Sequence, residues 1–272
     1  MKRIVYTFIV FFFAALTSLR AETTDWIEVH GGAVRLISAG PIEDGHYLAG
    51  LEFMLEPGWH TYWRYPGEAG IPPQITLTDT ENLREVEILY PVPERYSDGF
   101  SESIVYHDGI VLPIRIMPDD SEQKVRVDID LFFGICKDIC VPGDATLTLN
   151  LNPASEKDTL AAKLIERDLA NVPQASTADG LKIKSVSLTN EDRLVIETHV
   201  DAGSAPELFV AGPEGSYIGL AKLASQSGDQ ATWHLSTKGL KSSKGDDHLR
   251  IVLAVDGLAI EHLEPIQPSW VN

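Results

Sequence analysis

Apolar and polar residues alternate along most of the chain, in short runs of period two that are rich in β-branched and aromatic residues. This pattern predicts strands with one buried face, and the Gly, Pro, Asn and Asp residues between the runs predict turns. The clearest runs of the first half are Ala33–Ser38, Leu51–Leu55, Val111–Met117, Val125–Phe133 and Ala145–Leu151. Many short strands at such spacing predict a β-sandwich.

One segment follows a helical period instead. Leu160 and Leu164 recur at helical spacing, which predicts a helix over Ser155–Ala170. Ser155 is the expected capping residue of its first turn, and Pro173 is expected to stop it.

The stretch Asn171–Gly180 is small and polar, as a linker between domains would be. Strand patterns then resume at Leu181–Leu188, Arg193–Val200, Glu207–Val210, Thr232–Leu235 and Leu249–Val255. The prediction is an all-β protein. It comprises a first β-sandwich over residues 22–152, a helix and linker over 153–180, and a second, small β-sandwich domain over 181–272, with the two domains separable.

The N-terminus has the pattern of a secretory signal peptide over residues 1–21. Lys2 and Arg3 precede the apolar run Ile4–Leu19, and Ala21 is a small residue at the expected cleavage point. The alternative is an uncleaved membrane anchor, but the run has 16 residues, and a span needs about 20. We therefore expect a periplasmic protein that has no stable membrane insertion after cleavage.

The chain carries a formal net charge of -18, with 40 acidic and 22 basic residues. A surface this acidic repels phosphate backbones, so nucleic-acid binding is not expected.

The chain contains two cysteines, Cys136 and Cys140, and export would place them where a disulfide persists. If this C-x-x-x-C segment forms the tip of a hairpin, the two sulfurs face each other, since opposed residues have Cβ atoms about 4.5–5.5 Å apart. Lys137, between them, favours a thiolate and Asp138 opposes it. Three interpretations remain open: an exchanging pair, a permanent staple, and a metal site. A metal site is disfavoured because the eight histidines form neither H-x-H nor H-x-x-x-H.

Several motifs, taken together, resemble the N-terminal domain of the DsbD/ScsB group of thiol:disulfide interchange proteins. They are Gly58–Gly67 (GWHTYWRYPG) with Gly70–Pro73, Tyr90–Arg95 with Val111–Ile114, Cys136–Pro142 (CKDICVP), and Pro206–Gly215 (PELFVAGPEG), which is similar to the second β-domain of ScsB-type proteins. The resemblance implies an immunoglobulin-like sandwich that takes electrons from a membrane electron-transfer protein. It passes them to periplasmic thioredoxin-fold partners without a cofactor.

The resemblance also assigns roles to residues. Cys136 and Cys140 become the exchanging, catalytic pair. A flexible loop that shields the pair would correspond to Arg95–Asp108. The expected lid and site-lining residues in it are Phe100, Asp98 and Glu102.

Three departures from the family pattern bear on the role. Membrane and thioredoxin-like domains are missing, the cysteine spacing fits the ScsB branch better than DsbD, and Tyr65 stands where Asn is expected. We therefore expect either a separate, secreted partner in an electron relay or a relative that has lost the relay.

The aromatic motif alternates too. Trp59 and Trp63 would share one strand face with Thr61, and His60 and Tyr62 would lie on the other with Arg64. A packed core with an amphipathic outer face is the favoured interpretation, and a docking surface rich in Trp, Tyr and Arg is the alternative. His107 is a candidate for tuning the pKa of the cysteine pair, or a solvated loop residue.

The leading hypothesis is therefore a thiol:disulfide exchange protein, with possible activity as a protein-disulfide reductase or dithiol carrier. One rival is a binding or adaptor module with a structural disulfide, in a copper-stress context that the family suggests. The other is a surface-binding sandwich with no redox role.

Overall fold

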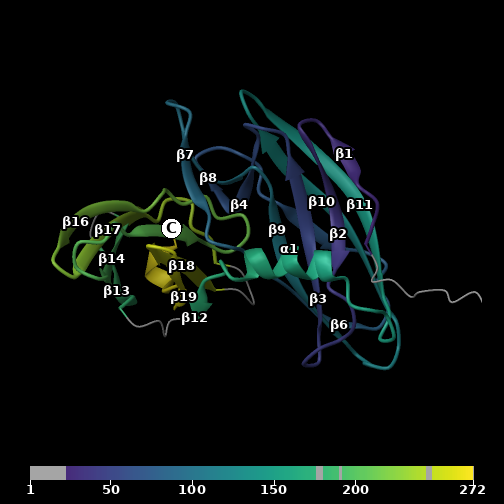
Figure 1. Ribbon diagram of the computed structural model, residues 1–272. Coiled ribbons are helices and arrows are strands. Elements are labelled where there is room, and N and C mark those ends of the chain that lie inside the picture. The colour runs from purple at the N-terminus through teal and green to yellow at the C-terminus, as the bar shows by residue number, and fades with distance from the viewer. Residues whose placement is uncertain (1–22, 176–179, 190–191, 243–246, 272) are drawn as a thin grey trace, which may run out of the picture.

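The computed structural model describes residues 23–175, 180–189, 192–242 and 247–271. Within them, two β-sandwiches follow each other along the chain with an α-helix between them (Figure 1). The expected all-β architecture is confirmed. The expected signal peptide, residues 1–21, lies outside the described residues, as do residues 176–179 of the expected linker. No helix of the described segments is long and apolar enough to cross a membrane.

The first sandwich consists of a five-stranded and a six-stranded antiparallel sheet. The five-stranded sheet has the order β1 (Ile27–Val29), β2 (Gly32–Ser38), β3 (Tyr47–Leu55), β9 (Ile110–Pro118) and β6 (Leu83–Ile88). The six-stranded sheet has the order β11 (Cys140–Leu151), β10 (Val125–Cys136), β4 (His60–Gly67), β8 (Glu102–His107) and β7 (Glu94–Ser97), with β5 (Gln74–Leu77) also paired to β10. Apolar side chains fill the space between the sheets, where the rings of Phe53 and Phe133 meet edge to face at 5.2 Å.

The second sandwich packs two four-stranded sheets. One has the order β12 (Gln174–Ala175), β19 (Leu258–Pro265), β18 (His248–Val255) and β15 (Glu207–Ala211), and the other has the order β13 (Lys182–Leu188), β14 (Arg193–His199), β17 (Gln230–Ser236) and β16 (Lys222–Ser227). A short 3₁₀ turn, Pro268–Trp270, follows β19. The patterns that predicted strands in this half correspond to β13, β14, β15, β17 and β18. Strand β16 escaped prediction because all its residues are exposed at a sheet edge, so its sequence shows no buried face.

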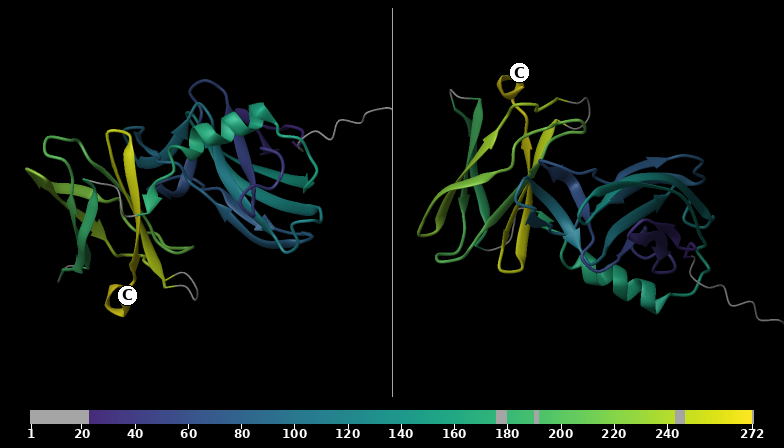
Figure 2. Two further views of the ribbon diagram at one scale, coloured as in Figure 1. Left: turned by 60° about the horizontal axis from the view of Figure 1, so that its bottom comes forward. Right: turned by 90° about the horizontal axis from the view of Figure 1, so that it is seen from above.

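Helix α1 (Thr159–Leu169) lies across the outer face of the five-stranded sheet, against β2, β3 and β9 (Figures 1 and 2). Ile165 packs on Ile37 and Val111 in a small apolar cluster. Gly50 of β3 allows this approach, since a Cβ there would lie 2.5 Å from Val111 Cγ1 and 3.1 Å from Ile165 Cγ1. The Asp168 carboxylate then accepts a hydrogen bond from the Val111 amide at 2.7 Å, which fixes the end of the helix to β9.

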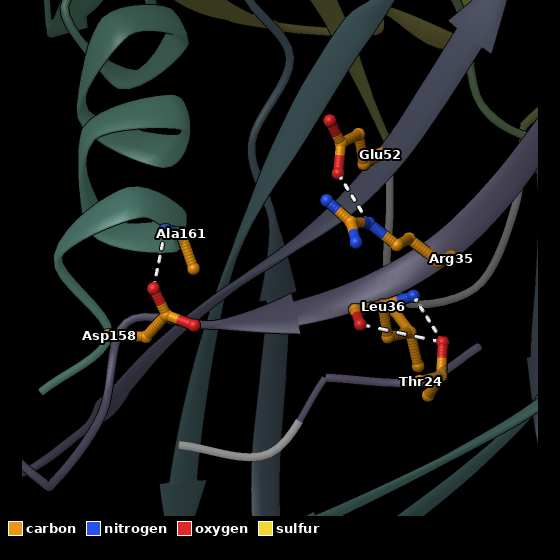
Figure 3. A network of polar contacts seen from close by, with 6 residues as sticks. All are labelled: Thr24, Arg35, Leu36, Glu52, Asp158 and Ala161. Atoms are coloured by element: carbon orange, nitrogen blue, oxygen red, sulfur yellow. Dashed lines mark hydrogen bonds and ion pairs between the residues drawn. The ribbon is translucent and has the colours of Figure 1, made fainter. Parts of the chain in front are cut away.

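The expected capping residue of α1 was wrong. The Asp158 side chain accepts hydrogen bonds from the amides of Leu160 and Ala161, each at 3.0 Å, and so satisfies donors that a helix start leaves unpaired (Figure 3). Ser155 instead donates its hydroxyl to the Asn152 carbonyl at 2.6 Å. The helix therefore begins later than the sequence pattern predicted, and Leu160 is exposed.

The first described residues are held against β2 by hydrogen bonds between Thr24 and Leu36 (Figure 3). The Thr24 hydroxyl accepts a hydrogen bond from the Leu36 amide at 2.9 Å, and the Thr24 amide donates to the Leu36 carbonyl at 2.9 Å. This pairing extends the edge of the sheet beyond β1. Next to it, Arg35 and Glu52, which are cross-strand partners on β2 and β3, form an ion pair at 2.7 Å.

The two sandwiches share a continuous apolar core and are joined by polar contacts. The Trp63 ring of β4 lies 6.2 Å from the Phe209 ring of β15, and the Tyr65 hydroxyl donates to the Ile218 carbonyl. Arg95 of β7 donates to the carbonyls of Leu208 and Ala221 at 2.8 and 2.9 Å. Because β15 is an edge strand, Arg95 covers at Leu208 a carbonyl group that the sheet itself leaves open.

Candidate functional site

The two cysteines close the tip of a long hairpin. Strands β10 and β11 pair without a register shift from Val125 opposite Leu151 to Cys136 opposite Cys140, and residues 137–139 make the turn. The cysteine Cα atoms are 4.2 Å apart and the sulfurs form a disulfide. The hairpin geometry expected from the C-x-x-x-C spacing is therefore present.

The two cysteines differ in exposure. Cys136 is 9% exposed, whereas Cys140 is an exposed residue. Lys137, expected to favour a thiolate, turns its Nζ to the Pro57 carbonyl at 3.3 Å. Of the two cysteines, Cys140 is therefore the one open to solvent.

A row of titratable side chains runs across the sheet from the disulfide. Cys136 is the cross-strand partner of His60 on β4, and His60 is the cross-strand partner of His107 on β8. Directly opposed residues project to the same face of a sheet, so the three side chains share one face. His60 is only 3% exposed, and its ring centroid lies 4.7 Å from that of Tyr96 and 5.4 Å from that of His107.

His60 is neutral in the disulfide form at pH 7. Burial is the main cause that lowers its pKa to about 4, and the nearby His107 lowers it further while Asp98 opposes the shift. His107 itself contacts the Glu94 carboxylate, with Nδ1 and Oε2 3.1 Å apart.

Tyr62 contacts the other cysteine. Its hydroxyl oxygen lies 2.6 Å from Cys140 Sγ. Burial, followed by Asp98 and Tyr96, raises the pKa of Tyr62 to about 12, so the hydroxyl keeps its proton and is available as a donor. The ring is held between two glycines: a Cβ on Gly70 would lie 2.2 Å from it, and one on Gly134 would lie 3.0 Å from it.

The β7–β8 hairpin forms the remaining wall of the site. An open cavity of about 330 Å³ lies between it and the disulfide, lined by His60, Tyr62, Ala69, Tyr96, Asp98, Phe100, Ser101, Ser103, Cys136, Lys137, Asp138 and Cys140. The structure therefore brings Asp98 and Phe100, two of the residues expected from the family pattern, to the cysteine pair.

The expected loop is largely an ordered hairpin, with only residues 98–101 between its strands. Asp98 accepts hydrogen bonds from the amides of Phe100 and Ser101 at 2.8 Å, and these bonds lower its pKa. Phe100 is fully exposed at the rim of the cavity, so in this arrangement its ring does not pack on the disulfide.

Glu102 does not line this cavity. Its carboxylate forms an ion pair with Arg95 at 2.7 Å. Both residues line a different cavity, beside β15 and β17 of the second sandwich. Of the two candidate acidic residues, Asp98 thus lies at the cysteines and Glu102 lies at the junction of the two sandwiches.

The structure corrects the interpretation of the aromatic motif. Trp59, Thr61 and Trp63 face the interior as expected, but His60 and Tyr62 on the opposite face are 3% and 1% exposed. The β7–β8 hairpin and the cysteine turn cover that face, so it is not an amphipathic surface open to solvent. The alternation of the motif placed His60 and Tyr62 on one strand face. It did not predict that β4 pairs with β10, which is the pairing that brings both residues to the cysteines.

Within the segments that the structure describes, no group of three or more His, Cys, Asp or Glu is arranged to hold a metal ion. The cavity at the disulfide is lined instead by phenols, an imidazole and carboxylates, which can donate, accept and hold protons; they belong to Tyr62, Tyr96, His60, Asp98 and Asp138.

Residues 33–152 match the family model described as "Thiol:disulfide interchange protein DsbD, N-terminal". This part of the chain is therefore similar to the N-terminal domain of DsbD. The matched range ends one residue after β11, so it includes the disulfide hairpin, the β7–β8 hairpin and the cavity between them.

The two sandwiches together also have a structural counterpart. The chain is similar to the crystal structure of the N-terminal periplasmic domain of ScsB from Proteus mirabilis, with a TM-score of 0.69 and 22% sequence identity over 90% of this chain and 98% of that chain. This likeness shows that the whole two-sandwich fold recurs. A search of curated proteins found no match.

Proposed function

We propose that this protein is a periplasmic thiol:disulfide exchange protein whose exchanging pair is Cys136 and Cys140. The observation that carries the proposal is a disulfide at an exposed hairpin tip, with one exposed cysteine, beside a cavity lined by protonatable groups. The disulfide closes a loop with only three residues between the cysteines, so it stabilises the fold weakly as a staple. Exposed disulfides of this kind exchange readily.

The difference in exposure supports one order of the steps. A thiolate of a partner dithiol attacks Cys140 Sγ, the intramolecular S–S bond breaks, and Cys136 leaves as a thiolate with the electron pair. The second thiol of the partner, as its thiolate, then attacks the partner sulfur in the mixed disulfide and releases Cys140 as a thiolate. The partner becomes a disulfide, and the pair gains two electrons and takes up protons from solvent or the thiols. The reverse sequence passes the electrons on.

Tyr62 supports the step at Cys140. A phenol that stays protonated at neutral pH can donate to the Cys140 thiolate, and the contact at 2.6 Å already exists in the disulfide form. Hydrogen bonding to the charged form lowers the pKa of a thiol, so more of it is present as the nucleophile.

The family model that residues 33–152 match supports thioredoxin-fold proteins as partners on one side, and the fold shared with a periplasmic ScsB domain supports the compartment. We place a membrane electron-transfer protein on the other side of the relay, and no cofactor within this chain. The proposal includes a cleaved signal peptide over residues 1–21 and two domains that meet within 153–180.

Phe100 fits the role of a mobile cover. It sits at the turn of a hairpin, fully exposed, at the rim of the cavity that contains both cysteines. Rotation of this four-residue turn would bring the ring over the sulfurs or leave them open, and a bound partner would hold it in the open arrangement.

Two single substitutions test the proposal. Cys136→Ala leaves the accessible Cys140 without a resolving thiol, so it should trap partners as mixed disulfides on a non-reducing gel of periplasmic extract. Cys140→Ala leaves only the nearly buried Cys136 and should trap few or none.

The same experiment separates exchange from a structural role. A permanent staple predicts equal loss of stability in both variants and no specific adduct. If neither variant gives an adduct, and the wild-type disulfide has a reduction potential below about -300 mV, the exchange proposal is wrong and a structural disulfide in an adaptor or binding module replaces it.

A further inference from the structure

The leaving sulfur needs a partner of its own. Tyr62 contacts Cys140, but the thiolate that forms at Cys136 is nearly buried, and burial disfavours a charged group unless a neighbour stabilises it. Lys137, the cation next in sequence, is directed to the Pro57 carbonyl instead. The residue directly opposite Cys136 on the neighbouring strand is His60.

We infer that His60 is the acid–base partner of Cys136: it stabilises the thiolate that leaves when Cys140 is attacked, and it returns a proton when the disulfide forms again. The inference rests on the proposed exchange function. It gives a role in that function to a buried histidine of β4, which lies outside the sequence motif around the cysteines.

The geometry suits a group that changes charge with the redox state. In the disulfide form the Asp98 carboxylate favours protonation of His60, but burial outweighs it and keeps the imidazole neutral. When the S–S bond breaks, the negative charge appears on its cross-strand partner, where Cβ atoms lie about 4.5–5.5 Å apart. A nearby anion raises the pKa of an imidazole and is itself stabilised by the N–H donor, so proton uptake at His60 accompanies reduction.

Other titratable groups face His60 from every side of the cavity. They are Tyr62 on its own strand, Tyr96 on β7, Asp98 in the β7–β8 turn, His107 on β8 and Cys136 on β10. Among them, His107 opposes protonation of His60, whereas Asp98 favours it. The two histidines therefore have opposite expected effects on Cys136, and this difference in sign makes the inference testable.

The measurement is the pKa of a single thiol in the full chain. Cys140→Ser leaves Cys136 alone, and the ultraviolet absorbance of its thiolate is followed against pH. We expect the added substitution His60→Phe, which preserves an aromatic ring but removes both nitrogens, to raise the Cys136 pKa by about one unit or more, a tenfold loss of thiolate at a given pH. His107→Gln should lower it, because His60 then takes up a proton more readily.

The control is His199→Gln, which removes a half-exposed histidine of the second sandwich that pairs with Asp229 at 3.3 Å and should leave the titration unchanged. A Cys136 pKa that does not rise in His60→Phe overturns the inference. If His60→Phe does not fold, the His107→Gln variant provides the test. A Cys136 pKa that is unchanged or higher in that variant also overturns the inference.

The titration needs no redox partner, so its outcome is independent of adduct formation. If Cys136→Ala traps adducts but His60→Phe does not change the Cys136 pKa, the exchange function is supported and only the role of His60 is wrong. A clear effect of His60 without adducts in either cysteine variant, together with the low reduction potential named above, would overturn the exchange function instead.

Discussion

The contact between Arg95 and the second sandwich leads to the sharpest stability prediction. Arg95→Met keeps most of the side-chain stem but removes every donor of the guanidinium. The carbonyls of Leu208 and Ala221, now bound at 2.8 and 2.9 Å, lose this partner, and the ion pair with Glu102 is lost as well.

The expected loss can be worked out from these contacts. A buried acceptor left without its donor costs about 1–3 kcal/mol, so two carbonyls account for about 2–6 kcal/mol. The partly exposed ion pair adds at most about 1 kcal/mol, and the guanidinium lies 5.5 Å from the Phe209 ring centroid, a cation–π contact worth about 0.5–1 kcal/mol. Since water reaches part of the site in the variant, we expect the free energy of unfolding to fall by about 3–5 kcal/mol.

Urea denaturation followed by tryptophan fluorescence measures this loss. Glu102→Gln is the matched control, because it removes the ion pair but leaves both carbonyl bonds, and it should cost at most about 1 kcal/mol. A loss below about 1 kcal/mol in Arg95→Met would refute the reasoning, since two unsatisfied carbonyls cannot cost so little unless they are already hydrated.

Two further substitutions test separate parts of the structure. Tyr62→Phe removes the hydroxyl at Cys140 and should slow reaction of the reduced protein with a small thiol reagent by severalfold at neutral pH; an unchanged rate would exclude the hydroxyl as a donor to the thiolate. Asp158→Ala removes the cap of α1 and should destabilise the protein by about 1 kcal/mol, measured as a lower melting temperature, whereas Ser155→Ala should cost less of the helix because Ser155 is not the cap.

Local sequence pattern was enough to predict much of the fold, because its signals act over a few residues. Val125–Phe133 and Ala145–Leu151 alternate cleanly, and both lie in the strands of the cysteine hairpin. The start of α1 was misplaced because Ser155 and Asp158 are both good capping residues, and only the packing of the helix on β9 selects between them. The polar edge strand β16 shows no buried face at all.

The candidate site was predictable only in part, for a related reason. Cys136 and Cys140 could be paired from their spacing, but His60 and Tyr62 lie more than seventy residues earlier and meet them through strand pairing over a long range. The family resemblance placed Asp98 and Glu102 together in the site, yet the two residues line different cavities, since Asp98 lies in the hairpin turn and Glu102 begins β8.

The register of the cysteine hairpin has one more consequence. Eleven residue pairs continue the ladder below Cys136 and Cys140 without a shift, so the shape of the hairpin does not depend on the bond at its tip. Opening that bond frees a very short loop and adds little conformational entropy. Under the proposed exchange function, the hairpin would therefore keep the same form in the oxidised and the reduced protein. A docking partner would then distinguish the two states by the charge and protonation at the tip, and not by a change of shape.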